Sequence, residues 1–186
     1  MKKIGLLGGS FNPAHDGHLY ISQKAIELLG LDEVWWLVSP QNPLKSTEQM
    51  APFAQRYEGA KDILKKYDNI IASDFEMVNQ TNKTYDSLSA LISKFSENNF
   101  IWLMGADNLV QFPQWYKYDA IMHMLPIAIF DRGDYAKNLN NTEFYKKYEK
   151  YLVDNSVIFT KDLPAWMFLK IDKHPASSTD IRARLR

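Results

Sequence analysis

Residues 4–18 read IGLLGGSFNPAHDGH, and this stretch sets the interpretation of the rest of the chain. Its first four residues are apolar without alternation, which is typical of a strand buried on both faces of a sheet. A Gly-Gly-Ser turn at residues 8–10 follows, and residues 17–29 are then predicted to form a helix. Successive backbone N–H groups at the start of a helix bind anions, and glycine lets a phosphate approach the backbone closely. The stretch therefore predicts a strand, a phosphate-binding turn and a helix, in that order.

Short apolar runs and longer amphipathic segments continue to alternate along the chain. Further strands are predicted at residues 34–38, 70–72, 100–104, 126–130 and 166–171. Helices are predicted over residues 53–64, over an apolar stripe at residues 88–95, and over residues 178–184. Pro52 suits the first turn of the first of these helices, and Thr84 is the expected N-cap of the second. The alternation predicts an α/β fold, a Rossmann-like parallel sheet with helices on both faces, whose ligands bind at the carboxyl ends of the strands.

Residues 134–155 differ from the rest because they are rich in Asn, Lys and Tyr and poor in aliphatic side chains. They predict an exposed, partly helical excursion and not a second domain. No internal repeat and no linker-like segment divides the sequence. We therefore expect a single domain over residues 1–186.

The composition excludes several classes of protein. Lys and Arg number 22, as do Asp and Glu, so the formal net charge is zero. This argues against nucleic acid or an anionic membrane as a partner, because both are bound mainly through bulk positive charge. The absence of cysteine excludes disulfides, thiolate metal sites and cysteine nucleophiles. No stretch approaches about 18 uninterrupted apolar residues, so the expected location is the cytoplasm, as a monomer or a homo-oligomer.

Two of the four histidines, His15 and His18, bracket the start of the predicted first helix. Positions three apart share one helix face, so both imidazoles can point into the same pocket. Paired donors on a phosphate are the favoured interpretation. The structural alternative is that His15 caps a loop and His18 packs under the sheet. A zinc site is disfavoured because no third ligand stands nearby at helical spacing.

Two separated motifs carry a resemblance to a known family. Residues 15–18 resemble the H-x-G-H signature of the nucleotidyltransferase superfamily, and residues 177–182 (SSTDIR) resemble its second signature, I-S-S-T-x-I-R. The intervening chain is similar to bacterial nicotinate-nucleotide adenylyltransferases. The blocks that carry this similarity are residues 39–45, 83–88, 105–108, 115–116 and 131–133. The resemblance covers essentially the whole length, in order and without large gaps.

Three departures from the family pattern qualify this resemblance. Leu44 occupies a place where many relatives carry His, and Ala176 replaces the isoleucine that usually opens the second signature. Relatives also continue for a further C-terminal helix beyond the position of Arg186.

The resemblance implies in-line attack by the phosphate of nicotinate mononucleotide on the α-phosphorus of ATP, with loss of pyrophosphate. The residues expected to act on the moving phosphates are His15, His18 and Arg182. His18 is expected at the α-phosphate, His15 on the β-phosphate side, and Arg182 at the β and γ oxygens because its donors are forked. The expected ATP-binding residues are Gly8, Gly9, Ser10, Phe11, Arg132, Ser178 and Thr179. Mg²⁺ is expected to arrive with ATP, because the sequence offers no dedicated carboxylate cage.

Several of these residues also have a structural interpretation. Ser178 and Thr179 look like an N-cap pair, and capping alone would explain both. Arg132, which follows the predicted strand at residues 126–130, suits the nucleotide side of the cleft, although an isolated arginine there is often part of a surface ion pair.

The residues expected to bind the mononucleotide are Lys45, Thr84, Tyr85, Asp107 and Trp115. Lys45 would meet its phosphate, although a lysine in such a loop is usually only solvated. Asp107 would meet a ribose hydroxyl or cap the short helix that follows it. Trp115, in a predicted exposed turn, would stack on the pyridine ring, and packing into the core is the alternative. The other four tryptophans are interpreted as packing residues.

Rival functions share parts of these signatures. Phosphopantetheine and nicotinamide-mononucleotide adenylyltransferases are the alternatives within the same class. Cytidylyltransferases share H-x-G-H but differ in the second signature, and the chain is too short for a class I tRNA synthetase. A nucleotide-binding regulator without catalysis is the alternative from another class. His15, His18 and Arg182 together count against it, because a sensor needs affinity and not transition-state donors.

Overall fold

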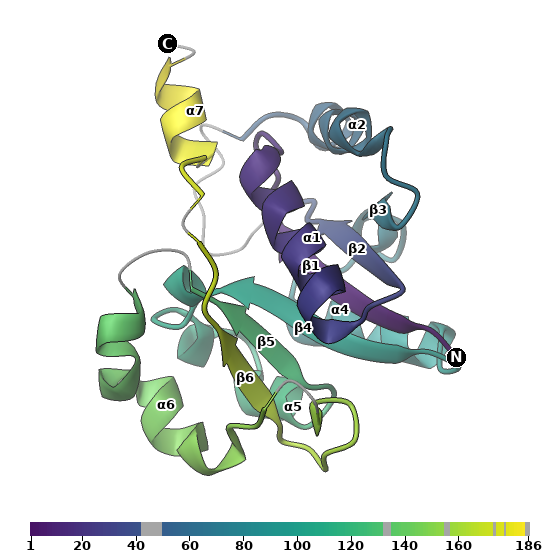
Figure 1. Ribbon diagram of the computed structural model, residues 1–186. Helices are drawn as coiled ribbons and strands as arrows, with labels where there is room; N and C mark the ends of the chain where they lie inside the picture. The colour runs from purple at the N-terminus through teal and green to yellow at the C-terminus, as the bar shows by residue number, and fades with distance from the viewer. Residues whose placement is uncertain (42–49, 132–134, 155–156, 173, 177, 185–186) are drawn as a thin grey trace.

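A computed structural model of the chain describes residues 1–41, 50–131, 135–154, 157–172, 174–176 and 178–184. Six strands form one parallel sheet in the order β3-β2-β1-β4-β5-β6 (Figure 1). The strands are β1 Lys3–Gly9, β2 Glu33–Val38, β3 Ile70–Ser73, β4 Asn99–Gly105, β5 Ile127–Phe130 and β6 Trp166–Leu169. The order reverses between β1 and β4, so the topological switch point lies at the carboxyl ends of these two central strands.

Helices cover both faces of the sheet. The α-helices are α1 Asp16–Leu29, α2 Phe53–Leu64, α3 Phe75–Val78, α4 Thr84–Lys94, α5 Tyr118–Met122, α6 Glu143–Tyr148 and α7 Ser178–Arg184. Short 3₁₀ helices are η1 Ala106–Asn108, η2 Phe112–Gln114, η3 Tyr135–Asn141 and η4 Glu149–Tyr151. In Figure 1, α1 lies in front of the sheet and α4 and α5 lie behind it. The predicted fold class is confirmed.

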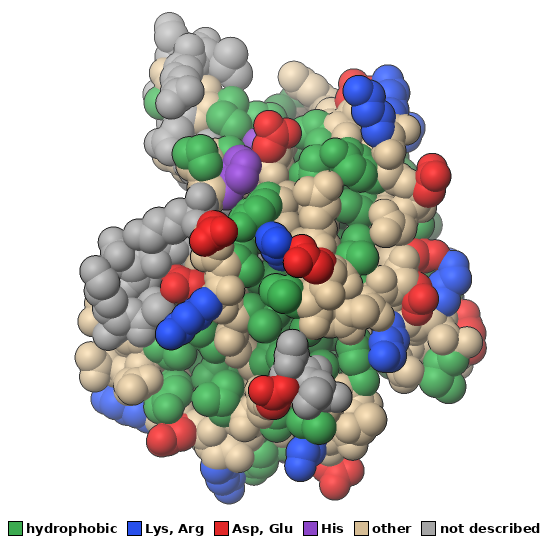
Figure 2. All heavy atoms as spheres, viewed as in Figure 1, with side chains coloured by type: hydrophobic (Ala, Val, Ile, Leu, Met, Phe, Trp, Pro, Cys, Tyr) green, Lys and Arg blue, Asp and Glu red, His purple; other side chains and the backbone are tan. Residues whose placement is uncertain are grey.

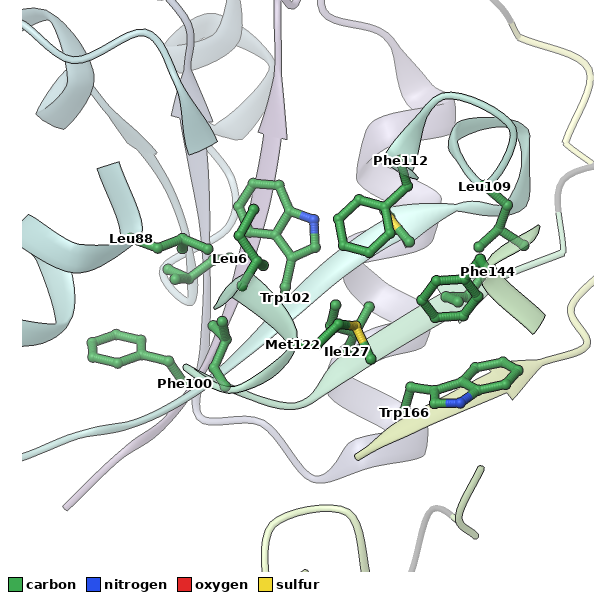
Figure 3. Packing of buried hydrophobic residues seen from close by; sticks show 14 of the residues in the cluster. Leu6, Leu88, Phe100, Trp102, Leu109, Phe112, Met122, Ile127, Phe144 and Trp166 are labelled. Atoms are coloured by element: carbon green, nitrogen blue, oxygen red, sulfur yellow. The ribbon is translucent and has the colours of Figure 1, made fainter. Parts of the chain in front are cut away.

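Successive side chains of a strand point to opposite faces of the sheet, and each face packs into its own hydrophobic core. Leu6 of β1 and its register partner Trp102 of β4 belong to the core under α4, α5 and α6, which Figure 3 shows. The next pair, Leu7 and Leu103, belongs to the core under α1 and α2. Because both faces are buried, the strands read as continuous apolar runs and not as alternating ones.

Predicted and observed boundaries agree closely, with three corrections at helix starts. Pro52 is the N-cap of α2 and lies just before its first turn. Thr84 is the first residue of α4, whose N-cap is the extended Lys83. Ser178 and Thr179 are the first two residues of α7 and not its caps. The Ser178 hydroxyl instead donates to the carbonyl of Pro13 (3.0 Å), a tertiary contact that the sequence could not reveal.

The expectation of an exposed excursion at residues 134–155 is partly wrong. The segment is helical in parts, as predicted, but Leu139, Phe144 and Tyr148 are buried in the core beside β6. Phe144 and Tyr148 stand four residues apart on one face of α6, so two aromatic rings supply the apolar contact that the scarce aliphatics do not. The Trp166 indole N–H donates to the carbonyl of Tyr148 (2.7 Å) and ties the segment to the sheet.

The face of the molecule that Figure 2 shows has no dominant charge. On the face shown in Figure 2, side chains of Lys and Arg are interspersed with those of Asp and Glu. Among the described residues, no helix is both long and apolar enough to cross a membrane.

Candidate active site

The carboxyl end of β1 is open although the strand lies in the middle of the sheet. Gly8 is exposed, whereas the residues before it from Ile4 to Leu7 are buried. A Cβ atom at Gly8 would meet Cη2 of the Trp102 ring at 2.4 Å, so only glycine fits beside this indole. At this exposed end of a central strand, beside the switch point, a ligand can reach the backbone.

The turn after β1 has an unusual backbone. Phe11 has a φ of 46°, in the left-handed region that a residue with a side chain rarely adopts. Its ring contacts two others, stacked on Trp36 (centroids 4.9 Å apart) and tilted against His18 (4.8 Å). These ring contacts help to hold the strained turn in place. Phe11 itself is buried, so its contribution to a ligand site is limited to its main chain.

Hydrogen bonds orient both histidines of the H-x-G-H motif. His15 is the N-cap of α1 and accepts at Nδ1 from the N–H of Gly17 (3.0 Å). The N–H of His15 in turn donates to Nδ1 of His18 (3.2 Å). A neutral imidazole that accepts at Nδ1 carries its proton at Nε2. The backbone thus selects the tautomer in which each ring presents Nε2–H as a donor. The rings lie 3.9 Å apart, so the predicted pair is formed, and capping and pairing occur together at His15.

The second signature packs against the first. A Cβ atom at Gly17 would stand 3.1 Å from the carbonyl oxygen of Ala176 and 2.9 Å from the His15 ring, which leaves room only for glycine. Arg182 donates from Nη1 to the carbonyl of Asn12 (2.5 Å) and lies near the hydroxyl of Thr179 (Nη2 to Oγ1, 3.4 Å). Together with the bond from Ser178 to Pro13, these contacts bring α7 to the turn after β1.

Buried oxygen atoms without a hydrogen-bond partner among the described residues lie at the carboxyl ends of the strands. They include Oγ of Ser10, after β1, and Oδ1 of Asp131, after β5. Buried polar atoms in proteins are normally hydrogen-bonded, so these two are suited to a bound ligand or an ordered water.

Comparison with known proteins now gives the family. The family model described as cytidylyltransferase-like matches residues 6–184. A protein of Parvibaculum lavamentivorans named "probable nicotinate-nucleotide adenylyltransferase" is 42% identical over 185 residues, which cover 98% of this chain and 92% of the relative. A protein of Rhizobium etli with the same name is 36% identical over 182 residues, covering 96% of this chain and 94% of that one. The chain belongs to the nicotinate-nucleotide adenylyltransferase family.

Solved structures confirm the fold. The structure described as Plasmodium falciparum nicotinic acid mononucleotide adenylyltransferase complexed with NaAD has a TM-score of 0.73 and 21% identity, covering 98% of this chain and 83% of its own. A putative nicotinate-nucleotide adenylyltransferase from Vibrio parahaemolyticus has a TM-score of 0.60 and 20% identity, covering 100% of this chain and 87% of its own. At these identities the likeness bears on the fold alone.

In this member of the adenylyltransferase family, Trp115 is half-buried and not freely exposed. Its ring meets those of Trp102 (centroids 6.3 Å apart) and Phe112 (5.2 Å) edge to face. Figure 3 shows Trp102 and Phe112 as neighbours within the hydrophobic core. The Trp115 ring, which is predicted to stack on the pyridine ring, is therefore supported by core residues on one side, and part of it remains accessible.

A cluster of aromatic and basic side chains joins the start of α4 to the two residues that follow Trp115. Tyr85, in the first turn of α4, and Tyr116 meet edge to face with ring centroids 6.0 Å apart. The ammonium group of Lys83 lies 4.4 Å from the centre of the Tyr116 ring, and that of Lys117 lies 4.4 Å from the Tyr85 ring. Lys117 lies two positions after Trp115 in the sequence, whereas Lys83 stands 32 positions before it and joins the cluster only through the fold.

The remaining predicted residues have different outcomes. Thr84 and Tyr85 are half-buried in the first turn of α4. Asp107 lies within η1 directly after β4, where the cap is Gly105 and not the aspartate. Lys45 and Arg132 lie outside the described residues. Within the described part of the chain, no group of three His, Asp or Glu side chains could hold a metal ion.

Two buried charged residues of this adenylyltransferase are not among the site residues predicted from the sequence. Arg56 of α2 donates to main-chain carbonyls near the turn after β1. Glu76 of α3 is 6% exposed. Burial raises the pKa of Glu76, and the hydroxyl groups of Ser87 in α4 and Ser39 after β2 lower it by less. A charged residue on the apolar face of a predicted helix is the signal that could have identified Arg56.

A cavity of about 220 Å³ lies at the opposite, amino end of the sheet. It is lined by Asn99 and Phe100 at the start of β4 and by Pro126 before β5, among others. Ligands in open parallel sheets bind at the carboxyl ends of the strands, so this cavity is not part of the candidate active site.

Proposed function

We propose that this protein transfers the adenylyl group of ATP to nicotinate mononucleotide, giving nicotinate adenine dinucleotide and pyrophosphate. The observation that carries the proposal is the convergence of His15, His18, Ser178 and Arg182 on the turn beside the exposed Gly8. Family membership supplies the reaction, and the geometry supports roles for individual residues.

The two histidines are suited to act as donors to phosphate oxygens. Each is held in the tautomer that presents Nε2–H, and His15 is fixed further because it caps α1. His18 would meet the α-phosphate, where negative charge develops as the acceptor attacks, and His15 the β-phosphate side. A prepositioned donor of this kind lowers the barrier by about 3–4 kcal/mol. No proton needs to leave the acceptor, because its nucleophile is already a phosphate oxygen.

The other ATP contacts belong to the same turn. The main-chain N–H groups of residues 9–11 would bind phosphate, since the open backbone at Gly8 gives access to them. Arg182 and the hydroxyls of Ser178 and Thr179 would meet the β and γ oxygens, with Arg132 on the nucleotide side. In-line transfer requires positioning and charge stabilisation but no covalent enzyme intermediate. We assign the metal requirement to Mg²⁺ that enters with ATP as part of the substrate, and the reaction to the cytoplasm.

The acceptor would lie across the switch point from ATP. Lys45 would meet the phosphate of the mononucleotide, Asp107 a ribose hydroxyl, and Trp115 the pyridine ring. The nicotinate carboxylate would then lie at the first turn of α4, where Thr84 and Tyr85 contribute unpaired helix N–H groups. Lys83 and Lys117 add positive charge at the same place. This arrangement favours the acid mononucleotide over the amide and over an uncharged acceptor arm.

A labelling experiment tests the reaction class directly. The protein is incubated with nicotinate mononucleotide, Mg²⁺ and ATP labelled either at the α-phosphate or at the γ-phosphate. Adenylyl transfer places the α label in the dinucleotide and the γ label in pyrophosphate. Transfer of the γ label to the mononucleotide would show a kinase instead. Binding of ATP without redistribution of either label would support a regulator without catalysis.

A further inference from the structure

Helix α2 carries a charged residue on its buried face. Arg56, Ala60 and Leu64 are the buried residues of this helix, and their spacing of four places them on one side. Arg56 is 3% exposed, and burial lowers the pKa of its guanidinium. No carboxylate in the described ranges is paired with it. A buried cation without a counter-ion is costly unless its donors are satisfied, so the groups that satisfy Arg56 indicate its role.

Four main-chain carbonyls accept from the Arg56 guanidinium. Nε donates to Ala51 (2.8 Å), Nη1 to Ser10 (2.5 Å) and Ser39 (2.8 Å), and Nη2 to Pro40 (2.8 Å). Four of the five N–H donors of the side chain are thus used. The acceptors follow β1, follow β2 and precede α2, so one planar group joins three segments at the carboxyl edge of the sheet.

The bond to Ser10 has a consequence for the next amide. In a trans peptide the C=O and N–H groups point in opposite directions, so the N–H of Phe11 points away from Arg56. The peptide between these two residues is not among the cis bonds of the described chain. The Phe11 N–H makes no hydrogen bond to another described residue. Arg56 therefore fixes the direction of an amide that makes no hydrogen bond within the described chain.

The same turn is held from its other side by α7. Arg182 donates to the carbonyl of Asn12, and Ser178 donates to that of Pro13. Three main-chain carbonyls of this turn, those of Ser10, Asn12 and Pro13, thus accept hydrogen bonds from side chains of α2 and α7, two helices far apart in sequence. The positive φ of Phe11 persists between these anchors.

We propose that Arg56 is a positioning residue for the polyphosphate of ATP. By binding the Ser10 carbonyl it aims the Phe11 amide at a phosphate, and its buried charge adds attraction for the anion. The inference rests on the proposed function only for the identity of the phosphate ligand. It predicts a loss of phosphate affinity that exceeds any loss of fold stability, whereas a merely structural arginine would affect stability alone.

The test compares Arg56→Lys with Leu64→Ala, a matched control on the same buried face of α2. Lysine keeps the charge, but a single ammonium group cannot reach four separated carbonyls as the guanidinium fork does. Calorimetry measures binding of inorganic pyrophosphate, and thermal unfolding measures stability. We expect the pyrophosphate Kd of Arg56→Lys to rise at least about tenfold, since a misplacement of about 1 Å can cost a hundredfold at such sites. Leu64→Ala should lower the melting temperature but leave this Kd within about twofold, because it removes packing and no donor.

A second measurement uses the wild-type protein and does not depend on either variant folding. In two-dimensional ¹H–¹⁵N spectra, the Phe11 amide should be among the resonances that shift most as pyrophosphate is added. No response at Phe11 would overturn the proposal, as would equal losses of pyrophosphate affinity in Arg56→Lys and Leu64→Ala. Neither measurement requires turnover, so a failure of the adenylyl-transfer assay would leave this inference standing.

Discussion

Substitution of Gly8 by alanine tests whether the exposed end of β1 shapes the acceptor site. The new Cβ atom would stand 2.4 Å from Cη2 and 2.9 Å from Cζ2 of Trp102, whereas ordinary contacts begin at 3.4 Å. The indole must therefore move by about 1 Å, and overpacking of this kind costs about 1–3 kcal/mol of folding free energy. Trp102 is 3% exposed and meets Trp115 edge to face, so its movement displaces the proposed ring platform.

The assay separates this effect from simple destabilisation. For Gly8→Ala, kcat/KM for nicotinate mononucleotide should fall by up to about a hundredfold, because a displacement of about 1 Å at a binding site has that effect. Gly5→Ala is the matched control in the same strand. Its Cβ would stand nearest to methyl groups of Leu103 and Leu31, at 2.7 and 2.8 Å, and these side-chain ends can move aside. Gly5→Ala should lose stability and keep its kinetics within about threefold, as expected for a core site away from the chemistry.

A double variant tests whether the effect of Gly8→Ala passes through Trp102. Trp102→Phe removes the outer ring of the indole, with which the new Cβ clashes, so the loss of folding free energy caused by Gly8→Ala should largely disappear in the double variant. Unfolding in urea measures the coupling between the two positions. Wild-type kinetics in a destabilised Gly8→Ala protein would refute the link between β1 and the acceptor site.

Three further predictions concern single side chains. His18→Ala should lower kcat by at least about a hundredfold while ATP still binds, because the donor acts chiefly in the transition state; more than a third of wild-type turnover would contradict its role. Trp115→Ala should raise the KM for the mononucleotide much more than that for ATP, and equal effects on both would indicate a packing role alone. Glu76→Gln should gain stability relative to the wild type as the pH rises above 4.5, the ordinary value for glutamate. The reason is that folding raises the pKa of this carboxyl, so the free energy of unfolding of the wild type falls once the pH allows the carboxyl to ionise in the unfolded chain. Urea unfolding of both proteins from pH 5 to 9 measures the difference in stability, and a difference independent of pH would contradict this prediction.

The sequence predicts the sheet well because parallel strands buried on both faces leave a strong local signal. The runs at residues 4–7, 34–38, 70–72 and 100–104 lie inside observed strands, and those at 126–130 and 166–171 extend past β5 and β6 by one or two residues. The histidine pair is equally local, since three residues of helix bring His15 and His18 together. The predicted fold and family are confirmed, whereas the roles of the individual site residues stay predictions.

Features that depend on tertiary contacts escape the sequence. The helical spacing could place Arg56 on a buried face, but nothing local shows that carbonyls from two strand ends accept its hydrogen bonds. The cluster of Lys83 and Lys117 forms only when α4 and the turn after η2 meet. Phe144 and Tyr148 look exposed in a polar segment until β6 provides the surface that they cover.

The preference between acid and amide mononucleotides tests the central claim most directly. Values of kcat/KM are measured for nicotinate and nicotinamide mononucleotide at identical ATP and Mg²⁺ concentrations. Two charge-assisted hydrogen bonds at about 1.5–3 kcal/mol each would favour the carboxylate, and the amide would turn an –NH₂ group toward the same donors. The account predicts a preference of about a hundredfold or more for nicotinate mononucleotide. Comparable values would show that the first turn of α4 does not select the anion, and faster turnover with the amide would contradict the substrate assignment.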